Sequence, residues 1–145
     1  MVEHVYRRAV AASRIDAVVV ATDDARVADA VDAFGGTAVM TRADHATGTD
    51  RLAEVARALD GEIILNVQGD EPLMTADAID AVAGLLLSRP DDLMATLRKR
   101  TEDDADMDNP SVVKLVVDAQ GYALYFTRSR IPYLRPGHPR VAGDR

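Results

Sequence analysis

Two kinds of apolar segment alternate along residues 1–90. Short runs rich in β-branched residues, at 17–21, 37–40 and 63–67, are typical of strands buried on both faces of a parallel sheet. Between them, apolar side chains recur with the 3.6-residue period of a helix. The members of the four predicted helical faces are Val5, Ala9, Ala12; Val27, Ala30, Val31, Phe34; Leu52, Val55, Ala56, Leu59; and Ile79, Val82, Ala83, Leu86. This alternation predicts an α/β fold with a doubly wound, mostly parallel sheet.

Capping residues agree with these helices. Thr22-Asp23-Asp24 and Thr75-x-Asp77 have the composition of helix starts, and Gly35-Gly36 and Gly61 that of helix ends. The first helix begins within two residues of Met1, whereas a doubly wound sheet normally opens with a strand. We therefore expect the chain to be part of a longer protein.

After Pro90 the pattern becomes one of strands and turns. Apolar runs at 93–97, 112–117 and 123–126 predict three further strands. The residues between the last two runs, 118–121, have turn composition and predict a hairpin.

The remaining segments are charged. Residues 101–108 include five acidic side chains, which is typical of a solvated loop, and from Thr127 onward the chain is basic and rich in Pro. We expect one partial domain over 1–145, with a core at 1–90 and a strand-rich extension and basic arm at 91–145.

Composition excludes several classes of protein. The chain has 145 residues, no Cys and a net charge of −7. Absent cysteines exclude disulfides and thiolate metal sites, and the negative charge argues against binding nucleic acid through phosphate neutralisation. No apolar run approaches the roughly twenty residues of a membrane span. We expect a soluble, cytoplasmic protein with no nucleic-acid or membrane partner.

The loop at 68–72 is the first candidate site. A buried strand is expected to deliver Asp70 to the carboxyl edge of the sheet, where ligands bind in open α/β folds. Mg²⁺ typically takes one or two protein carboxylates together with phosphates and water, and Asp70 suits that role. The alternative is that Asp70 and Glu71 only cap the next helix, for which Thr75 or Asp77 already serves.

The loop at 41–51 is the second candidate site. Gly48 and Thr49 at a helix start offer backbone N–H groups and a hydroxyl to an anion, and Arg42 and Arg51 suit phosphate or carboxylate. The alternative is a capped loop with solvated charges, Arg51 being an ordinary surface residue. His45 has no second His or Cys at ligand spacing, so we interpret it as a hydrogen-bonding or packing residue.

Other chemistries lack their motifs. The sequence contains neither Gly-x-Gly-x-x-Gly nor a Walker loop, and no Gly-x-Ser-x-Gly elbow. The acidic pair Asp23-Asp24 also occurs in receiver-like domains, but here it has the position of a helix cap.

Taken together, the loops resemble a known family. The motifs that carry the resemblance are Val20-Ala21-Thr22-Asp23-Asp24; Met40-Thr41-Arg42-Ala43-Asp44-His45; Gly48-Thr49-Asp50-Arg51-Leu52-Ala53-Glu54; Asn66-Val67-Gln68-Gly69-Asp70-Glu71-Pro72; Asn109-Pro110 with Val113-Lys114; and Gly121-Tyr122-Ala123-Leu124-Tyr125-Phe126-Thr127-Arg128 with Ile131-Pro132. In this order they closely resemble the 3-deoxy-manno-octulosonate (Kdo) cytidylyltransferases, or CMP-Kdo synthetases, from Met1 to about Pro139.

The resemblance implies a Rossmann-like sheet with helices on both faces. It also implies the reaction that the family catalyses. The anomeric hydroxyl of Kdo attacks the α-phosphorus of CTP to give CMP-Kdo and pyrophosphate for lipopolysaccharide synthesis, with Mg²⁺ as cofactor. Asp70 and Gln68 are then the candidate catalytic residues. Asp70 is the metal ligand, and Gln68 lies beside the nucleotide or sugar. The remaining candidates line the cytidine pocket, and they are Arg42, Asp44, His45, Gly48 and Thr49. The family also suggests a homodimer formed through the region after residue 90.

The sequence departs from the family at both ends. The family's Gly-rich triphosphate loop precedes the position of Met1, and its C-terminal third follows that of Arg145. We therefore expect this chain alone to be inactive. The alternatives are another sugar-acid cytidylyltransferase, such as one for sialic acid, and a non-catalytic nucleotide-binding module. Arg128 and Arg130, in the basic segment, are candidates for attracting an anionic substrate or for a dimer contact.

Overall fold

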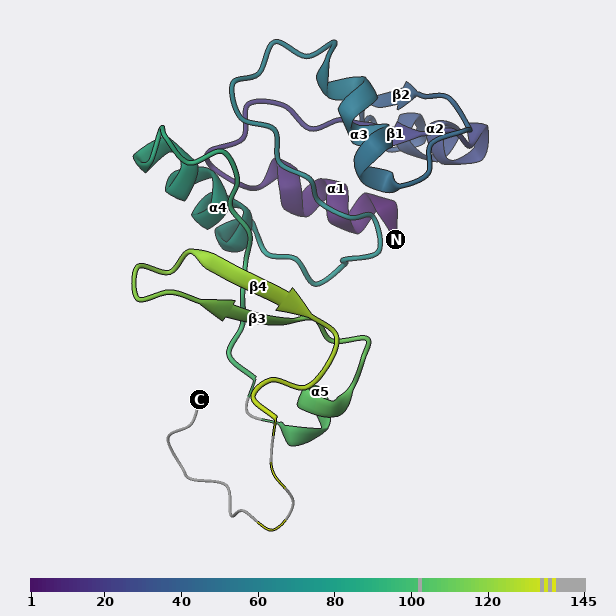
Figure 1. Ribbon diagram of the computed structural model, residues 1–145. Coiled ribbons are helices and arrows are strands. Elements are labelled where there is room, and N and C mark those ends of the chain that lie inside the picture. Colours follow the sequence, from purple (N-terminus) through teal and green to yellow (C-terminus); the bar gives the residue numbers. More distant parts are fainter. Residues whose placement is uncertain (102, 134, 136, 138–145) are drawn as a thin grey trace. The chain divides into compact units, whose positions relative to one another are not determined.

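The computed structural model describes residues 1–101, 103–133, 135 and 137 (Figure 1). The chain divides into two compact units, Met1–Leu97 and Arg98–Arg145. The division at residue 90 that the composition suggests stays a prediction, and much of the basic arm lies outside the described residues.

The first unit combines helices with a parallel pair of strands. Its elements are α1 (Val2–Val10), β1 (Val20–Thr22), α2 (Ala25–Ala33), β2 (Ala38–Met40), α3 (Gly48–Ala56) and α4 (Ala76–Ser88). β1 and β2 run parallel, with Val20 opposite Ala38 and Thr22 opposite Met40. α2 packs against both strands and α3 against β1 (Figure 1). This is the α/β arrangement that the alternating pattern predicts.

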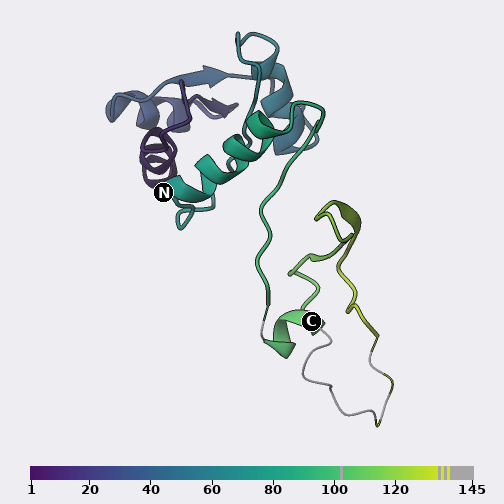
Figure 2. The ribbon, with the colours of Figure 1, turned by 90° about the vertical axis from the view of Figure 1, so that its left-hand side faces the viewer.

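α1 and α4 lie side by side and enclose the core of this unit (Figures 1 and 2). Ala9 and Ala12 pack with Ile79 there, as the helical faces predict. Leu65 and Val67 pack against the same cluster. The core therefore anchors the segment that leads directly into the candidate loop at 68–72.

Helix starts follow the capping residues. Asp24 caps α2 by accepting a hydrogen bond from the backbone N–H of Arg26, and Thr75 caps α4 in the same way through Ala78. Gly35, at φ 78°, ends α2 in the left-handed conformation that glycine adopts without strain. The predicted end at Gly61 is wrong, because α3 stops at Ala56.

Two predicted strands do not form within the described residues. The segment 63–67 is extended and keeps an alternating burial pattern, yet it has no hydrogen-bonded neighbour. Leu93 and Met94 are 94% and 89% exposed, so 93–97 is not a buried strand either. Periodicity identifies apolar extended segments, but a strand also needs a partner for its backbone N–H and C=O groups.

The second unit contains α5 (Asp104–Asp108) and the antiparallel hairpin of β3 (Lys114–Val117) and β4 (Ala123–Thr127). The hairpin and its turn are confirmed. The acidic run, expected to be only a loop, forms α5, which Asp103 caps. The buried ammonium of Lys114 donates to the carbonyls of Asn109, Val112 and Arg128.

Within the described parts of the chain, no helix is long and apolar enough to cross a lipid bilayer.

Candidate functional site

The loop 41–47 connects the end of β2 to the start of α3. Its first residues follow the carboxyl end of a parallel strand, which is where ligands bind in open α/β sheets. Its last residue, Thr47, caps α3: the hydroxyl oxygen accepts from the backbone N–H of Asp50 at 3.1 Å and donates to the Asp50 carboxylate at 2.6 Å. The start of α3 is therefore defined by the loop itself.

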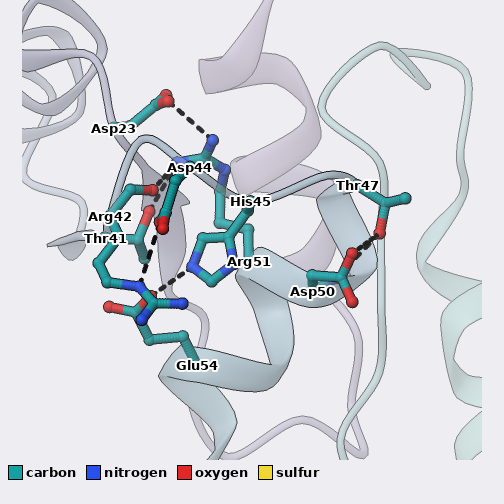
Figure 3. A network of polar contacts seen from close by, with 9 residues as sticks. All are labelled: Asp23, Thr41, Arg42, Asp44, His45, Thr47, Asp50, Arg51 and Glu54. Carbon is teal, nitrogen blue, oxygen red and sulfur yellow. Dashed lines mark hydrogen bonds and ion pairs between the residues drawn. The ribbon is translucent and has the colours of Figure 1, made fainter.

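Arg51 ties the start of this loop to the turn after β1 (Figure 3). Its guanidinium lies 2.8 Å from the Asp23 carboxylate, donates to the Thr41 hydroxyl at 2.6 Å and reaches the Arg42 carbonyl at 3.4 Å. The Arg51 side chain is only 18% exposed. The interpretation of Arg51 as an ordinary surface residue is therefore wrong.

Glu54 gathers the middle of the loop (Figure 3). Its carboxylate bonds the His45 imidazole and lies 3.7 Å from Nε of Arg42, which is itself 3.3 Å from the Asp44 carboxylate. The His45 side chain is buried, 7% exposed, whereas the Arg42 and Asp44 side chains are largely exposed. His45 is thus the hydrogen-bonding histidine that its sequence context indicates.

These contacts shift the titration of two carboxyl groups. The hydrogen bond to His45 holds the pKa of Glu54 below its ordinary value, and the hydrogen bond from Arg51 does the same to the pKa of Asp23. Both groups stay ionised at neutral pH. Glu54 on α3 consequently places a fixed negative charge beside the loop, whose Arg42 guanidinium is exposed, while the charge of Asp23 is paired with Arg51.

Gly48 and Gln68 lie next to each other. A Cβ placed on Gly48 would sit 3.5 Å from the Gln68 side-chain oxygen, and the Gln68 amide nitrogen in turn donates to the Asn66 side chain at 3.0 Å. The first turn of α3 and the segment after 63–67 therefore meet, although they are far apart in the sequence. Thr49 is exposed in the same first turn.

A cavity of about 570 Å³ reaches this meeting point. Much of its wall is apolar and comes from α1, β1 and the 63–67 segment. Its polar lining includes Gly48, Arg51, Asn66 and Gln68. Ala9 and Ile79 of the core also line this cavity, so it is continuous with the core and reaches the candidate loops at Gly48, Gln68 and Gly69.

Asp70 stands apart from these contacts. It lies exposed in a turn in which the Glu71 N–H donates to the Gln68 carbonyl at 3.2 Å. A Cβ on the neighbouring Gly69 would meet no atom within 4 Å, so the space beside this turn is open. The structure thus brings Arg42, Asp44 and His45 together around Glu54 and Gly48 beside Gln68, but leaves Asp70 and Thr49 without described contacts to them.

Sequence reasoning missed the parts played by Asp23 and Glu54. Asp23 had the position of a helix cap, but Asp24 is the cap and Asp23 pairs with Arg51 instead. The available signal was spacing: Arg51 and Glu54 are three residues apart in one helix and so share a face. Their partners lie in loops, where periodicity predicts no contacts.

Arg128 and Arg130 are engaged within the second unit. Arg128 donates to the Pro110 carbonyl at 2.8 Å, and Arg130 pairs with Asp104 and Asp108 of α5. A role of these arginines toward a substrate or a second subunit stays a prediction.

Comparison with known proteins identifies close relatives. The family model described as cytidylyltransferase matches residues 1–138. The chain is 53% identical over 135 residues to the 3-deoxy-manno-octulosonate cytidylyltransferase of Pelobacter propionicus, and equally to that of Geobacter sulfurreducens. Each alignment covers 93% of this chain, and 53% and 54% of the two relatives. The chain therefore spans about half the length of the curated relatives it matches.

A solved structure is also similar. A CMP:2-keto-3-deoxy-manno-octonic acid synthetase complexed with CTP superimposes with a TM-score of 0.82 at 41% sequence identity, over 93% of this chain and 56% of that one. This match confirms the predicted fold class, a partial α/β fold of the nucleotidyltransferase type.

Proposed function

The chain belongs to the cytidylyltransferase family, and we propose that it is part of an enzyme that activates Kdo with CTP, giving CMP-Kdo and pyrophosphate. The relatives named for this reaction share about half of their residues with the chain over the aligned region. Because the chain spans only part of these relatives, we assign to it one task of the enzyme, the binding of the nucleotide.

The observation that carries this proposal is the meeting of three segments in the first unit. The first turn of α3 at Gly48 lies beside Gln68, and the loop 41–47 is held against the same helix. A helix start presents unpaired N–H groups and a partial positive charge, which suit a phosphate. Arg42 adds an exposed cation that can bind an anion bidentately.

Within this site we assign roles to the predicted residues. Arg42, Asp44, Gly48 and Thr49 contact the nucleotide, and the buried His45 takes part in binding it by holding their loop through Glu54. Gln68 contacts the nucleotide or the sugar acid. Phosphoryl transfer depends on positioning and charge stabilisation rather than on covalent catalysis by the protein, and such groups contribute to holding the α-phosphate for attack by a sugar hydroxyl.

Asp70 is the residue that we assign to Mg²⁺. Among the described residues no group of three or more His, Asp or Glu side chains forms a cage for a metal. An exposed single carboxylate beside open space fits Mg²⁺, which usually keeps water and phosphate oxygens as its other ligands. When bound, the ion neutralises charge on the phosphates.

Calorimetric titration of this chain with CTP, in the presence of Mg²⁺, tests the proposal. We expect CTP to bind at least about tenfold more tightly than UTP or ATP, because a site that hydrogen-bonds a base rejects bases lacking those groups. Equal affinity for all three nucleotides, or no binding of CTP, would contradict it.

A pyrophosphate-release assay tests which sugar acid is the substrate. It is run with different sugar acids, both on this chain and on a longer protein that contains it. Turnover with Kdo but not sialic acid supports the assignment, and the reverse supports the other sugar-acid cytidylyltransferase. Turnover by this chain alone would contradict the expected inactivity, and CTP binding without turnover in any longer protein would favour a non-catalytic module. A cytoplasmic location, a homodimer and a place in lipopolysaccharide synthesis are further parts of the proposal.

A further inference from the structure

We infer that Arg51 and Glu54 are positioning residues that hold the loop 41–47 in place before any ligand binds. The inference rests on the proposed function only for what the loop then binds, namely CTP. The holding itself is a property of the free chain and can be tested without a nucleotide.

Arg51 and Glu54 both face the loop from α3 (Figure 3). Arg51 and Glu54 are three residues apart in α3 and project from the same face of the helix toward the loop (Figure 3). Val55, on the helix face that packs inward, is 6% exposed, so the helix that carries both groups is anchored in the unit.

The Arg51 guanidinium contacts two loops at once. One guanidinium bonds groups from two separate connections: Asp23 after β1, and Thr41 and the Arg42 carbonyl after β2. These two loops follow the neighbouring parallel strands β1 and β2, so Arg51 links them at the carboxyl edge of the sheet. A planar fork of N–H donors meets several acceptors in fixed directions, which a lysine ammonium does not reproduce.

Glu54 holds the middle of the loop through His45. Its carboxylate bonds the buried His45 ring, and Arg42 lies 3.7 Å away on the same oxygen. His45 is thereby turned inward and its neighbours Arg42 and Asp44 are left at the surface. The contact of Glu54 with His45 therefore determines the backbone conformation of residues 42–45.

These contacts fix the loop at three places. Arg51 holds its start, Glu54 its middle, and Thr47, through the cap on Asp50, its end. A loop held in this way loses little conformational entropy when a ligand binds, which increases affinity without adding a ligand contact.

Hydrogen–deuterium exchange of the full chain tests the inference. The variants are Arg51→Lys, which keeps the charge but loses the fork, and Glu54→Gln, which keeps an oxygen acceptor but loses the charge. Matched controls are Arg57→Lys, on the exposed residue that ends α3, and Glu3→Gln, in the exposed Glu3–Arg7 pair of α1.

We expect the hydrogen-bonded amides at the two ends of the loop 41–47 to exchange about tenfold faster in both variants, with α1, α2 and α4 unchanged, because local opening depends on local contacts. These are the Thr41 amide, which donates to the Thr22 carbonyl, and the Asp50 amide, which donates to the Thr47 hydroxyl. The controls should match the wild type. We expect CTP affinity to fall by a similar factor in the two variants only.

Unchanged exchange of the Thr41 and Asp50 amides in either variant would overturn the inference. So would acceleration spread evenly over the first unit, because that result indicates general stability rather than positioning. If the wild type binds no CTP, the proposed function fails, while the exchange data still decide the positioning role.

Discussion

The two candidate loops of the first unit are held in different ways. The loop 41–47 is fixed by polar contacts to α3, including the Arg51 and Glu54 networks. The turn at 68–71 is anchored behind by apolar packing of Leu65 and Val67 and carries the exposed Asp70 at its tip. The conformation of the loop 41–47 is thus held by contacts within the protein, whereas Asp70 at the tip of the turn 68–71 has no described partner.

We relate this difference to two tasks: the loop 41–47 recognises the nucleotide, and Asp70 in the turn 68–71 binds the metal. A prearranged loop suits recognition of a nucleotide, because specificity needs groups that are already in position. An exposed carboxylate costs nothing to keep in water and gains its partner when a metal and phosphates arrive together. We expect substitutions near α3 to change both stability and CTP affinity, and substitution of Asp70 to change CTP affinity alone.

The largest expected effect comes from the core behind the second loop. Ile79 is 4% exposed and packs with Leu65 and Val67, so Ile79→Ala should lower the free energy of unfolding by about 2–5 kcal/mol. Limited proteolysis should cut 63–71 faster than in the wild type and leave 41–47 unchanged, because the polar contacts of α3 do not depend on this side chain. Chemical denaturation and proteolysis measure these two effects, and equally faster cleavage in the two loops would break the comparison.

The next effect concerns Asp70 itself. Asp70→Asn should leave the free energy of unfolding within about 0.5 kcal/mol of the wild type, since the residue is exposed. It should weaken CTP binding in Mg²⁺ about 100-fold, because a metal ligand is lost. Calorimetry with and without Mg²⁺ measures this, with the neighbouring exposed Glu71→Gln as control. An Asp70→Asn variant that keeps Mg²⁺-dependent CTP binding would contradict the assignment.

A smaller effect is expected at the helix cap. Thr47→Ala removes the hydroxyl that accepts from the Asp50 N–H and should cost about 1 kcal/mol of stability. Thr75→Ala removes the equivalent cap of α4 and provides the matched comparison. We predict that only the Thr47 variant also weakens CTP binding. Similar CTP affinities in both variants would show that the end of the loop does not matter for the site.

The smallest effect is a dependence on pH. Because the pKa of Glu54 lies below its ordinary value of 4.5, the ionised carboxylate stabilises the fold above that pH, and its contribution is lost as the pH falls through the lowered pKa. The side-chain carboxyl carbon signal of Glu54 should therefore titrate with a midpoint below pH 4.5 in nuclear magnetic resonance spectra. The Glu54→Gln variant identifies this signal, because it removes it. A midpoint at or above 4.5 would contradict the hydrogen bond to His45.

The sequence predicts the helices well, because a helix satisfies its own backbone and shows its buried face as a period. The faces with Val5 and Ala9, and with Ile79 and Ala83, are buried as expected. The strands at 63–67 and 93–97 are missing because strand formation depends on a neighbouring strand that a local pattern does not specify. The pairing of Asp23 with Arg51 could not be predicted for the same reason, since it joins a loop to a helix that is distant in the sequence.

The most direct test of the site is a CTP titration of the isotopically labelled chain, with Mg²⁺, followed by amide chemical shifts. We predict that the shifts concentrate in two segments, 41–49 and 68–70, with little change in the hairpin of β3 and β4. Perturbation of only one of these segments, or of the second unit instead, would contradict a shared nucleotide site.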